Sequence, residues 1–472
     1  MATIDPAVLK WPAPRRSMGL KLLLVCAMAL LMSIPALAVF MLLGDRTNRA
    51  QEVTAEVGGL VGGEQTFLGP VLAIPYSTPP AAKDQGPGAG VFVVFPVTGE
   101  ARVDSKSEVR QRSLFKVPVY VAELNFTARF DLRGVQALTP RGATLDWGRA
   151  EILVGATDPR GAQSDVTLSL GGQPRAVAPA AVLTGATLAG DAAKIEPDRY
   201  AGAGGSLRFF GASAAGFGPE TQFDASATLR FSGAQRFAVL PFAKTTQLKV
   251  KGDWPSPSFD GGFLPRQREL GPNGFTADWN VPFIARGVPA QGDSDLIERL
   301  QPSALGVSFV ESANPYQSVA RSLKYALMFV GLVFLAYFLF ETTQGKRVHP
   351  AQYVLIGLAQ VVFYLLLLSI AERIGFDGGF AIAASATVGL ISAYAGWVFE
   401  SRRQGVIALI CFSALYGLIY VLMRLEDWAL LVGAFASFAA IAAAMFITRR
   451  LDWYGSAAPL PDPAPTSLKD AA

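Results

Sequence analysis

The strongest feature of the chain is a set of six long apolar runs, one near the N-terminus and five in the last third. They are Leu22–Leu43, Ser322–Phe340, Tyr353–Ala371, Gly379–Phe399, Gly405–Met423 and Trp428–Thr448. A bilayer core about 30 Å thick is crossed by roughly 20 helical residues, and each run has about that length. The last four contain no charged residue and no polar stripe, unlike the helices of a soluble core. The pattern therefore predicts about six membrane-spanning helices.

The first run leaves open whether it is a cleaved leader or a permanent anchor. It contains the segment Pro35-Ala36-Leu37-Ala38, which is similar to a signal-peptide cleavage site. The apolar run continues beyond this segment to Leu43, and this favours an uncleaved signal anchor. Either alternative sends the following segment across the membrane.

Between the first and second runs, apolar and polar residues alternate with period two, most clearly in segments 124–132, 166–170 and 223–231. Turns containing Gly and Pro separate these segments, which is typical of antiparallel sheets with one wet face. Helical periodicity is expected at Arg46–Leu60, and the segment 178–220, rich in Ala and Gly, is expected to form a mobile insertion. The pattern predicts a β-rich domain, with two packed sheets as one arrangement.

Charge in the short loops sets the expected orientation. Alternate loops carry the pairs Lys346 and Arg347, Arg402 and Arg403, and Arg449 and Arg450. Cytoplasmic loops show such a positive excess, so these loops and both termini are expected in the cytoplasm. The predicted organisation is a cytoplasmic N-terminus (1–21), a transmembrane signal anchor (22–43), a β-rich extracytoplasmic, or periplasmic, domain (44–320), a five-helix transmembrane bundle (321–448) and a cytoplasmic tail (449–472). The fold class is an α-helical membrane bundle with a large β-rich domain inserted between spans one and two.

Composition narrows the possible chemistry. Hydrophobic residues make up 51% of the chain and charged residues 17%, and the formal charge of +4 forms no basic block, so no nucleic-acid partner is expected. Cys26 and Cys411 both lie inside apolar runs, which argues against a structural disulfide. The sequence contains no phosphate-binding loop motif, so ATP-driven transport by this chain alone is not expected.

The chain has one histidine, His349, in the stretch GKRVHPAQY between two apolar runs. Its expected cytoplasmic position leaves the exported domain without a histidine for nucleophilic catalysis or for zinc. Pro350 suits the first turn of a helix, and Glu341 ends the preceding run within reach of the imidazole. A helix-end role or a pairing with Glu341 is therefore expected. No catalytic residue, cofactor or metal is predicted, although paired carboxylates for glycoside hydrolysis in the exported domain stay open.

Ionisable residues gather at the ends of the spans, whereas coupled carriers usually place them near the bilayer centre. The candidate structural or functional rim is Glu341, His349, Glu372, Arg373, Arg424, Glu426 and Asp427. At the expected outer face, Glu372 and Arg373 end one span, and the segment 424–427 joins two others. Ion pairs among these residues would tie three helices together. Contact with the exported domain or with a lipid headgroup is the alternative.

Several blocks, taken in order along the chain, resemble the CreD family of bacterial inner-membrane proteins. They are GEQTFLGPVLAIPY (63–76), LKVKGDWPSPSFDGGFLPRQREL, GFTADWNVPF, LGVSFVESANPYQSVARSLKYALMFV, HPAQYVLIGLAQVVFYLLLLSIAERIGF, LYGLIYVLMRLEDWALLVG and TRRLDWY. The chain departs from the family pattern where GGLVGGEQ lacks a tryptophan and where Arg373 replaces a histidine. The resemblance implies a non-enzymatic inner-membrane protein that supports cell-envelope integrity.

Two classes of function follow from these features. The first is an envelope-integrity or interaction protein, whose partners are the lipid bilayer and envelope or cell-wall proteins that bind the periplasmic domain. The second is a transporter or membrane-embedded enzyme that handles a lipid or a cell-wall precursor. A continuous polar cavity in the bundle would favour the second class. A tightly packed bundle and an exposed apolar patch on the domain would favour the first.

Overall fold

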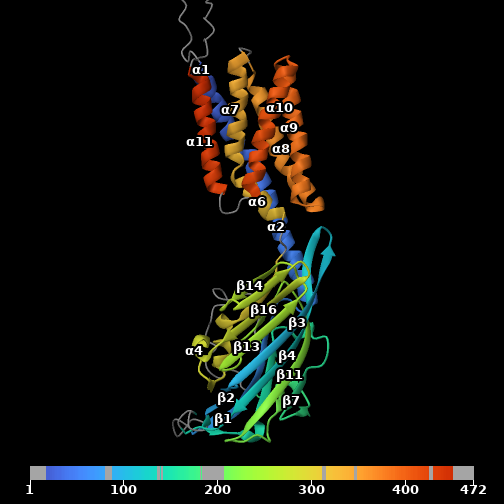
Figure 1. The fold of residues 1–472 in the computed structure, drawn as a ribbon, viewed down its shortest axis with the longest axis vertical. Coiled ribbons are helices and arrows are strands. Elements are labelled where there is room, and N and C mark those ends of the chain that lie inside the picture. Colours follow the sequence, from blue (N-terminus) through green and yellow to red (C-terminus); the bar gives the residue numbers. More distant parts are fainter. Residues whose placement is uncertain are drawn as a thin grey trace, which may run out of the picture. The chain divides into compact units, whose positions relative to one another are not determined.

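The computed structural model describes residues 18–79, 88–135, 139, 142–180, 182, 207–310, 315–344, 348–424 and 429–449. The chain forms two compact units. One comprises Met1–Asn48 together with Ala313–Ala472, and the other comprises Arg49–Ser312. The first unit is helical and the second is built mainly from β-strands (Figure 1).

The helical unit confirms the six predicted spans. Its helices are α1 (Met18–Leu31), the first part of α2 (Ser33–Leu60), α6 (Pro315–Lys324), α7 (Ala326–Gln344), α8 (Pro350–Ile374), α9 (Phe376–Val398), α10 (Arg402–Arg424) and α11 (Ala429–Thr448). Within the described residues, six helical segments are long and apolar enough to cross a membrane. The first comprises α1 and α2, and α7 to α11 provide the other five.

The helix boundaries differ from the apolar runs at two places. α1 ends at Leu31 and α2 begins at Ser33, because Pro35 has no N–H to donate to the carbonyl of Leu31. α2 then continues past the apolar run to Leu60, which confirms the helix predicted at Arg46–Leu60. The predicted run beginning at Ser322 is divided at Tyr325, where α6 ends and α7 follows.

Aromatic and small residues pack the helices of the bundle. The ring of Phe363 on α8 makes edge contacts with Phe380 on α9, at 5.6 Å between centroids, and with Tyr416 on α10, at 5.0 Å. Gly396 and Gly405 bring the backbones of α9 and α10 close together, since a side-chain carbon at Gly396 would lie 3.5 Å from Gly405 Cα. Small residues of this kind allow close helix packing in a membrane.

The β unit contains two sheets. The described residues give the first sheet ten strands, with β14-β18-β12-β1-β6-β10-β9 in line and β2, β5 and β17 beside this path. Their bounds are β1 (Gln65–Thr78), β2 (Gly88–Val94), β5 (Thr144–Leu145), β6 (Glu151–Ala156), β9 (Ala178–Pro179), β10 (Arg208–Ser213), β12 (Arg236–Val239), β14 (Pro257–Gly261), β17 (Gln291–Asp293) and β18 (Leu305–Phe309).

The second sheet has eight strands among the described residues, in the order β15-β16-β13-β3-β4-β11-β7-β8. Their bounds are β3 (Thr98–Arg112), β4 (Phe115–Asp131), β7 (Thr167–Leu170), β8 (Gln173–Arg175), β11 (Gln222–Ala234), β13 (Thr245–Gly252), β15 (Gln267–Gly271) and β16 (Gly274–Val281). Buried and exposed residues alternate along β4 and β11, as the period-two pattern predicted.

Two features of the sheets differ from the sequence expectation. Most pairings are antiparallel, but β1 runs parallel to β12 and β3 runs parallel to β13. The mobile insertion expected over 178–220 is wrong at its ends, because β9 and β10 pair with each other and β10 pairs with β6. Residues 183–206 of that segment lie outside the described residues.

The two sheets pack face to face, which confirms the predicted packed sheets. Aromatic rings from the two sheets meet in one core: Phe67 of β1 contacts Phe231 of β11, with 5.5 Å between centroids. Phe242 is fully buried and makes an edge contact with Phe126 of β4 at 5.5 Å. Its ring also rests on Gly99, where a side-chain carbon would lie 2.5 Å from the ring. Phe242 therefore fills a space that is shaped by a glycine.

Replacing Phe242 by alanine should destabilise the β unit by about 3–5 kcal/mol, because it removes a fully buried ring and leaves a cavity. Urea unfolding of the detergent-solubilised protein, followed by tryptophan fluorescence, measures the change. Val109→Ala is the matched control, since Val109 is 48% exposed near the end of β3. Equal stability of the two variants would contradict this account of the core.

Candidate functional site

A buried carboxylate joins three helices at one end of the bundle. Glu341, near the end of α7, is 4% exposed. It forms an ion pair with Lys21 of α1 and accepts a hydrogen bond from Tyr353 Oη of α8 at 2.9 Å. The backbone N–H of Val348 donates to the same carboxylate at 2.8 Å, and Lys21 Nζ donates to the Val348 carbonyl at 3.2 Å. The carboxylate is therefore held by an ammonium, a phenol and a backbone amide.

His349 lies beside this cluster but serves as the N-cap of α8. Its Nδ1 accepts a hydrogen bond from the N–H of Ala351 at 3.2 Å. Gln352 Oε1 accepts from the N–H of His349 at 3.1 Å, which completes a reciprocal cap, and Pro350 occupies the first helical position. Two roles were expected for His349: a helix-end role or a pairing with Glu341. The structure shows the helix-end role, because His349 caps α8 and the carboxylate of Glu341 is bonded to other groups.

Sequence reasoning missed the other members of the Glu341 cluster. Lys21 directly precedes the first apolar run, and Tyr353 is the first residue of the third. The available signal was a carboxylate directly after one apolar run and a lysine directly before another. A charge buried in a membrane protein is normally paired, so each of these residues could be expected to have a partner, although the sequence does not say which one.

The rim residues near the other helix ends form two separate pairs in the described part of the chain. Arg424, at the end of α10, makes an ion pair with Asp377 of α9. Tyr420 Oη donates to Asp377 at 3.1 Å. Glu372 instead accepts a hydrogen bond at 3.1 Å from Tyr316 Oη of α6, and burial raises the pKa of this phenol, so it stays a donor at neutral pH.

Among the described rim residues, Arg373 is not part of these pairs. Arg373 is exposed next to Glu372 at the end of α8. Glu426 and Asp427 lie outside the described residues. The ion pair that the structure does have uses Asp377, which the sequence analysis did not include in the rim.

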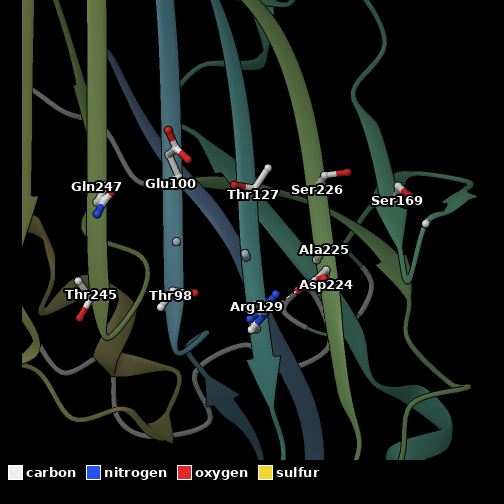
Figure 2. Close-up of a pocket in the computed structure, with 13 residues that line it drawn as sticks. Thr98, Glu100, Thr127, Arg129, Ser169, Asp224, Ala225, Ser226, Thr245 and Gln247 are labelled. Atoms are coloured by element: carbon white, nitrogen blue, oxygen red, sulfur yellow. Dashed lines mark hydrogen bonds and ion pairs between the residues drawn. The ribbon is translucent and has the colours of Figure 1, made fainter.

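A hollow of about 610 Å³ lies on the face of the eight-stranded sheet that points away from the core (Figure 2). Its lining is mostly short and polar and includes Thr127 and Ser226 on the neighbouring strands β4 and β11. Arg129 and Asp224 line one side, and Arg129 Nε donates to Asp224 Oδ1 at 3.1 Å. The arrangement offers hydroxyl, guanidinium and carboxylate groups to a polar molecule in solution.

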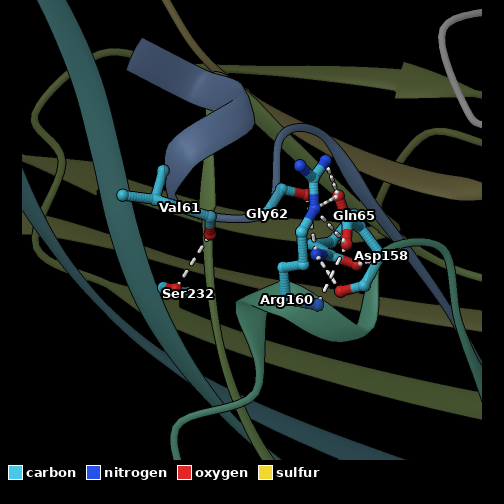
Figure 3. Close-up of polar contacts among 6 residues, drawn as sticks. All are labelled: Val61, Gly62, Gln65, Asp158, Arg160 and Ser232. Atoms are coloured by element: carbon cyan, nitrogen blue, oxygen red, sulfur yellow. Dashed lines mark hydrogen bonds and ion pairs between the residues drawn. The ribbon is translucent and has the colours of Figure 1, made fainter. Parts of the chain in front are cut away.

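A set of polar contacts fastens the end of α2 to the β-sheets (Figure 3). Gln65, which is fully buried at the start of β1, donates to the carbonyl of Gly62 at 2.8 Å and to that of Asp158 at 2.9 Å. Its Oε1 accepts from the N–H of Asp158 at 3.2 Å. Ser232 Oγ of β11 donates to the carbonyl of Val61 at 2.8 Å. We call these contacts, together with those of Arg160, the α2 clasp.

Arg160 completes the α2 clasp, and the backbone conformation of Gly62 fits it. The Arg160 guanidinium binds Asp158 side on, and this hydrogen bonding holds the pKa of the carboxyl below its ordinary value. Gly62 has φ of +99°, and a side-chain carbon there would lie 2.7 Å from Gln65 Nε2. The clasp therefore requires glycine at position 62.

Carboxylates also approach each other near the α2 clasp. Burial raises the pKa of Glu64, with Arg236 acting in the opposite direction. Asp260 accepts hydrogen bonds from Arg236 Nε at 2.8 Å and from Ser308 Oγ. Such bonds are typical of a structural ion pair. Among the described residues there is no group of three or more His, Cys, Asp or Glu side chains that could hold a metal ion.

Comparison with known proteins gives a match over nearly the whole chain. A family model described as "Inner membrane protein CreD" matches residues 17–454. The Inner membrane protein CreD of Escherichia coli (strain K12) is 28% identical over 438 residues, which cover 91% of this chain and 92% of that protein. The matched region includes every residue of the Glu341 cluster, the α2 clasp and the hollow.

Lys21→Met should destabilise the bundle by about 3 kcal/mol, because it leaves the buried Glu341 carboxylate without its cation. Adding Glu341→Gln should restore most of this loss, since the amide can still bond to Tyr353 without a charge. Thermal unfolding of the detergent-solubilised protein measures both changes. His349→Gln, at the exposed cap nearby, is the control and should change little. A double variant no more stable than Lys21→Met would contradict the pairing.

Proposed function

This chain belongs to the CreD family of inner membrane proteins, and from that premise we propose that it supports cell-envelope integrity as a non-enzymatic protein. In this proposal residues 44–320 lie in the periplasm and both termini lie in the cytoplasm. The β unit acts as an interaction domain for envelope or cell-wall proteins. The helical bundle keeps that domain at the membrane.

The observation that carries this proposal is the α2 clasp. α2 is one helix from Ser33 to Leu60, so its first part belongs to a span and its last part to the β unit. Gln65 and Ser232 then bond the residues that follow this helix, Gly62 and Val61, to both sheets. The β unit therefore begins on the same helix whose first part is apolar enough to span a membrane, as suits a domain that is anchored in a membrane.

The use of charged groups gives further support. The Lys21–Glu341, Arg424–Asp377 and Arg236–Asp260 pairs each join separate elements of one unit. In each pair the charges satisfy one another, as in a structural ion pair, instead of facing a shared reaction centre. The relative in E. coli is likewise named as an inner membrane protein, without an enzyme name.

A second candidate function is the handling of a lipid or cell-wall precursor by the bundle. The observation that favours it is the set of buried polar atoms on Gln360, Ser392 and Tyr337. Each of these side chains has at least one atom without a hydrogen-bond partner among the described residues, and both amide atoms of Gln360 are in this state. Such atoms require a polar partner, which a transported molecule or bound water would supply.

The proposed orientation predicts the outcome of reporter fusions. Fusions at Ser258 and Gly378 should report an exported position, and fusions at Gly345 and Gln404 a cytoplasmic one, because the positive loops stay inside. Paired alkaline phosphatase and fluorescent protein fusions measure the two locations. An exported reporter at Gly345 would overturn the proposed topology.

Deletion of the gene should raise sensitivity to detergents and to wall-active agents, and the wild-type protein should reverse this. Growth at graded concentrations of these agents, with protein levels checked by immunoblotting, measures the effect. Gln360→Leu should restore growth as well as the wild type does. If Gln360→Leu fails at a normal protein level, the second candidate function replaces the first. Turnover of a wall or lipid substrate by the purified protein would contradict the non-enzymatic role.

A further inference from the structure

The strand register of the eight-stranded sheet aligns five polar side chains into one row, which we call the polar row. It consists of Gln247, Glu100, Thr127, Ser226 and Ser169, one from each of β13, β3, β4, β11 and β7, and each is paired with the next. Strands lie about 4.8 Å apart, so the polar row is about 19 Å long. It runs across the strands, and all five residues line the hollow shown in Figure 2.

The sheet surface is hollowed along the polar row because the central side chains of the row are short. Thr127 and Ser226 form its centre, and both are exposed. Residues two positions apart on a strand point to the same face, so Arg129 and Asp224 stand beside them as one wall. Short side chains beside this wall leave the hollow, which we call the groove.

The charges beside the polar row are largely balanced. Glu100 accepts hydrogen bonds from Arg102 Nε at 2.9 Å and from Lys249 Nζ at 3.3 Å. The hydrogen bond from Arg102 holds the pKa of Glu100 below its ordinary value, so this carboxylate is charged at neutral pH. Among the residues lining the hollow, one arginine faces two carboxylates. The lining itself therefore offers a polyanion no positive excess.

The groups in the groove match a molecule with many hydroxyl groups. Hydroxyls and amides both donate and accept hydrogen bonds, carboxylates accept and guanidinium groups donate. The backbone groups of the five strands are already used in the sheet ladder, so a peptide cannot add to them as a further strand. Among the described residues that line the hollow, the apolar ones are Ala128 and Ala225, and their side chains are buried in the core, which gives an apolar ligand little to bind.

We infer that this groove binds an extended, uncharged glycan chain laid across β13, β3, β4, β11 and β7. The inference rests on the proposed function, because the periplasmic orientation is what exposes this sheet to the polysaccharides of the envelope. Among the described residues that line the groove, none is aromatic. Binding therefore depends on hydrogen bonds without ring stacking, and a weak, rapidly exchanging complex is expected.

The test is a titration of the full-length protein in lipid nanodiscs with chitotetraose, an uncharged oligosaccharide of N-acetylglucosamine, followed by saturation-transfer difference NMR. The wild type should bind saturably. Thr127→Tyr should weaken binding at least about tenfold, because the ring fills the centre of the polar row. Thr276→Tyr is the matched control, since Thr276 is an exposed threonine on the same face of the sheet, on β16 and outside the groove.

A second variant removes the concern that tyrosine disturbs the sheet. Ser226→Ala keeps the shape of the groove and should weaken binding about fivefold through the loss of one hydrogen bond. Circular dichroism checks the fold of all three variants.

Each outcome of the titration decides the inference. Binding that is weakened by Thr127→Tyr and Ser226→Ala and kept by Thr276→Tyr supports it. Lack of saturable binding by the wild type, equal binding by all variants, or binding of poly-L-glutamate in place of chitotetraose overturns it. The proposed function is judged separately by the deletion strain, where a missing envelope defect would overturn that function whatever the titration gives.

Discussion

The way in which α2 ends against the sheets is the constraint on which the rest of the β unit depends. The carbonyl groups of Val61 and Gly62 directly follow α2, and burying a carbonyl group without a donor would be costly. Ser232 and Gln65 supply the donors for Val61 and Gly62. Gln65 is also the first residue of β1, so one side chain both satisfies the turn after α2 and fixes the start of the strand. β1 pairs with β2, β5, β6 and β12, and its position therefore determines the register of most of its sheet.

The bundle uses charge in two different ways. Glu341 is buried, and its bonds to Lys21, Tyr353 and Val348 hold α1, α7 and α8 in one arrangement. The Arg424–Asp377 pair is more than half exposed, so solvent screens it and it contributes little to stability. The buried cluster therefore contributes specificity to helix packing, and the exposed pair does so only weakly. This contrast separates the two ends of the bundle, although both resemble a charged rim in the sequence.

Sequence patterns predicted the helices and strands of this protein, and the buried face of its strands, better than they predicted the contacts between side chains. The spans follow from uninterrupted apolar runs, and the alternation along β4 and β11 gave the buried face of each strand. Lys21 and Glu341 are 320 positions apart, and nothing in the local pattern around either residue identifies the other. The parallel pairing of β3 with β13 and the polar row depend on register between distant strands, which alternation does not determine. The helix cap formed by His349 could be predicted, because its signal is local: a proline at the next position.

The strand order has a consequence for how the protein is made. β1 is synthesised early, but its partner β12 lies at residues 236–239, and β12 in turn pairs with β18 at residues 305–309. The sheet containing β1 is therefore completed only after nearly the whole β unit has been synthesised, shortly before the second apolar span is made. Contacts so distant in sequence form slowly. Until they form, the apolar residues of β1 and its unpaired backbone are open to aggregation, so biogenesis of this protein calls for a factor that shields the nascent strand.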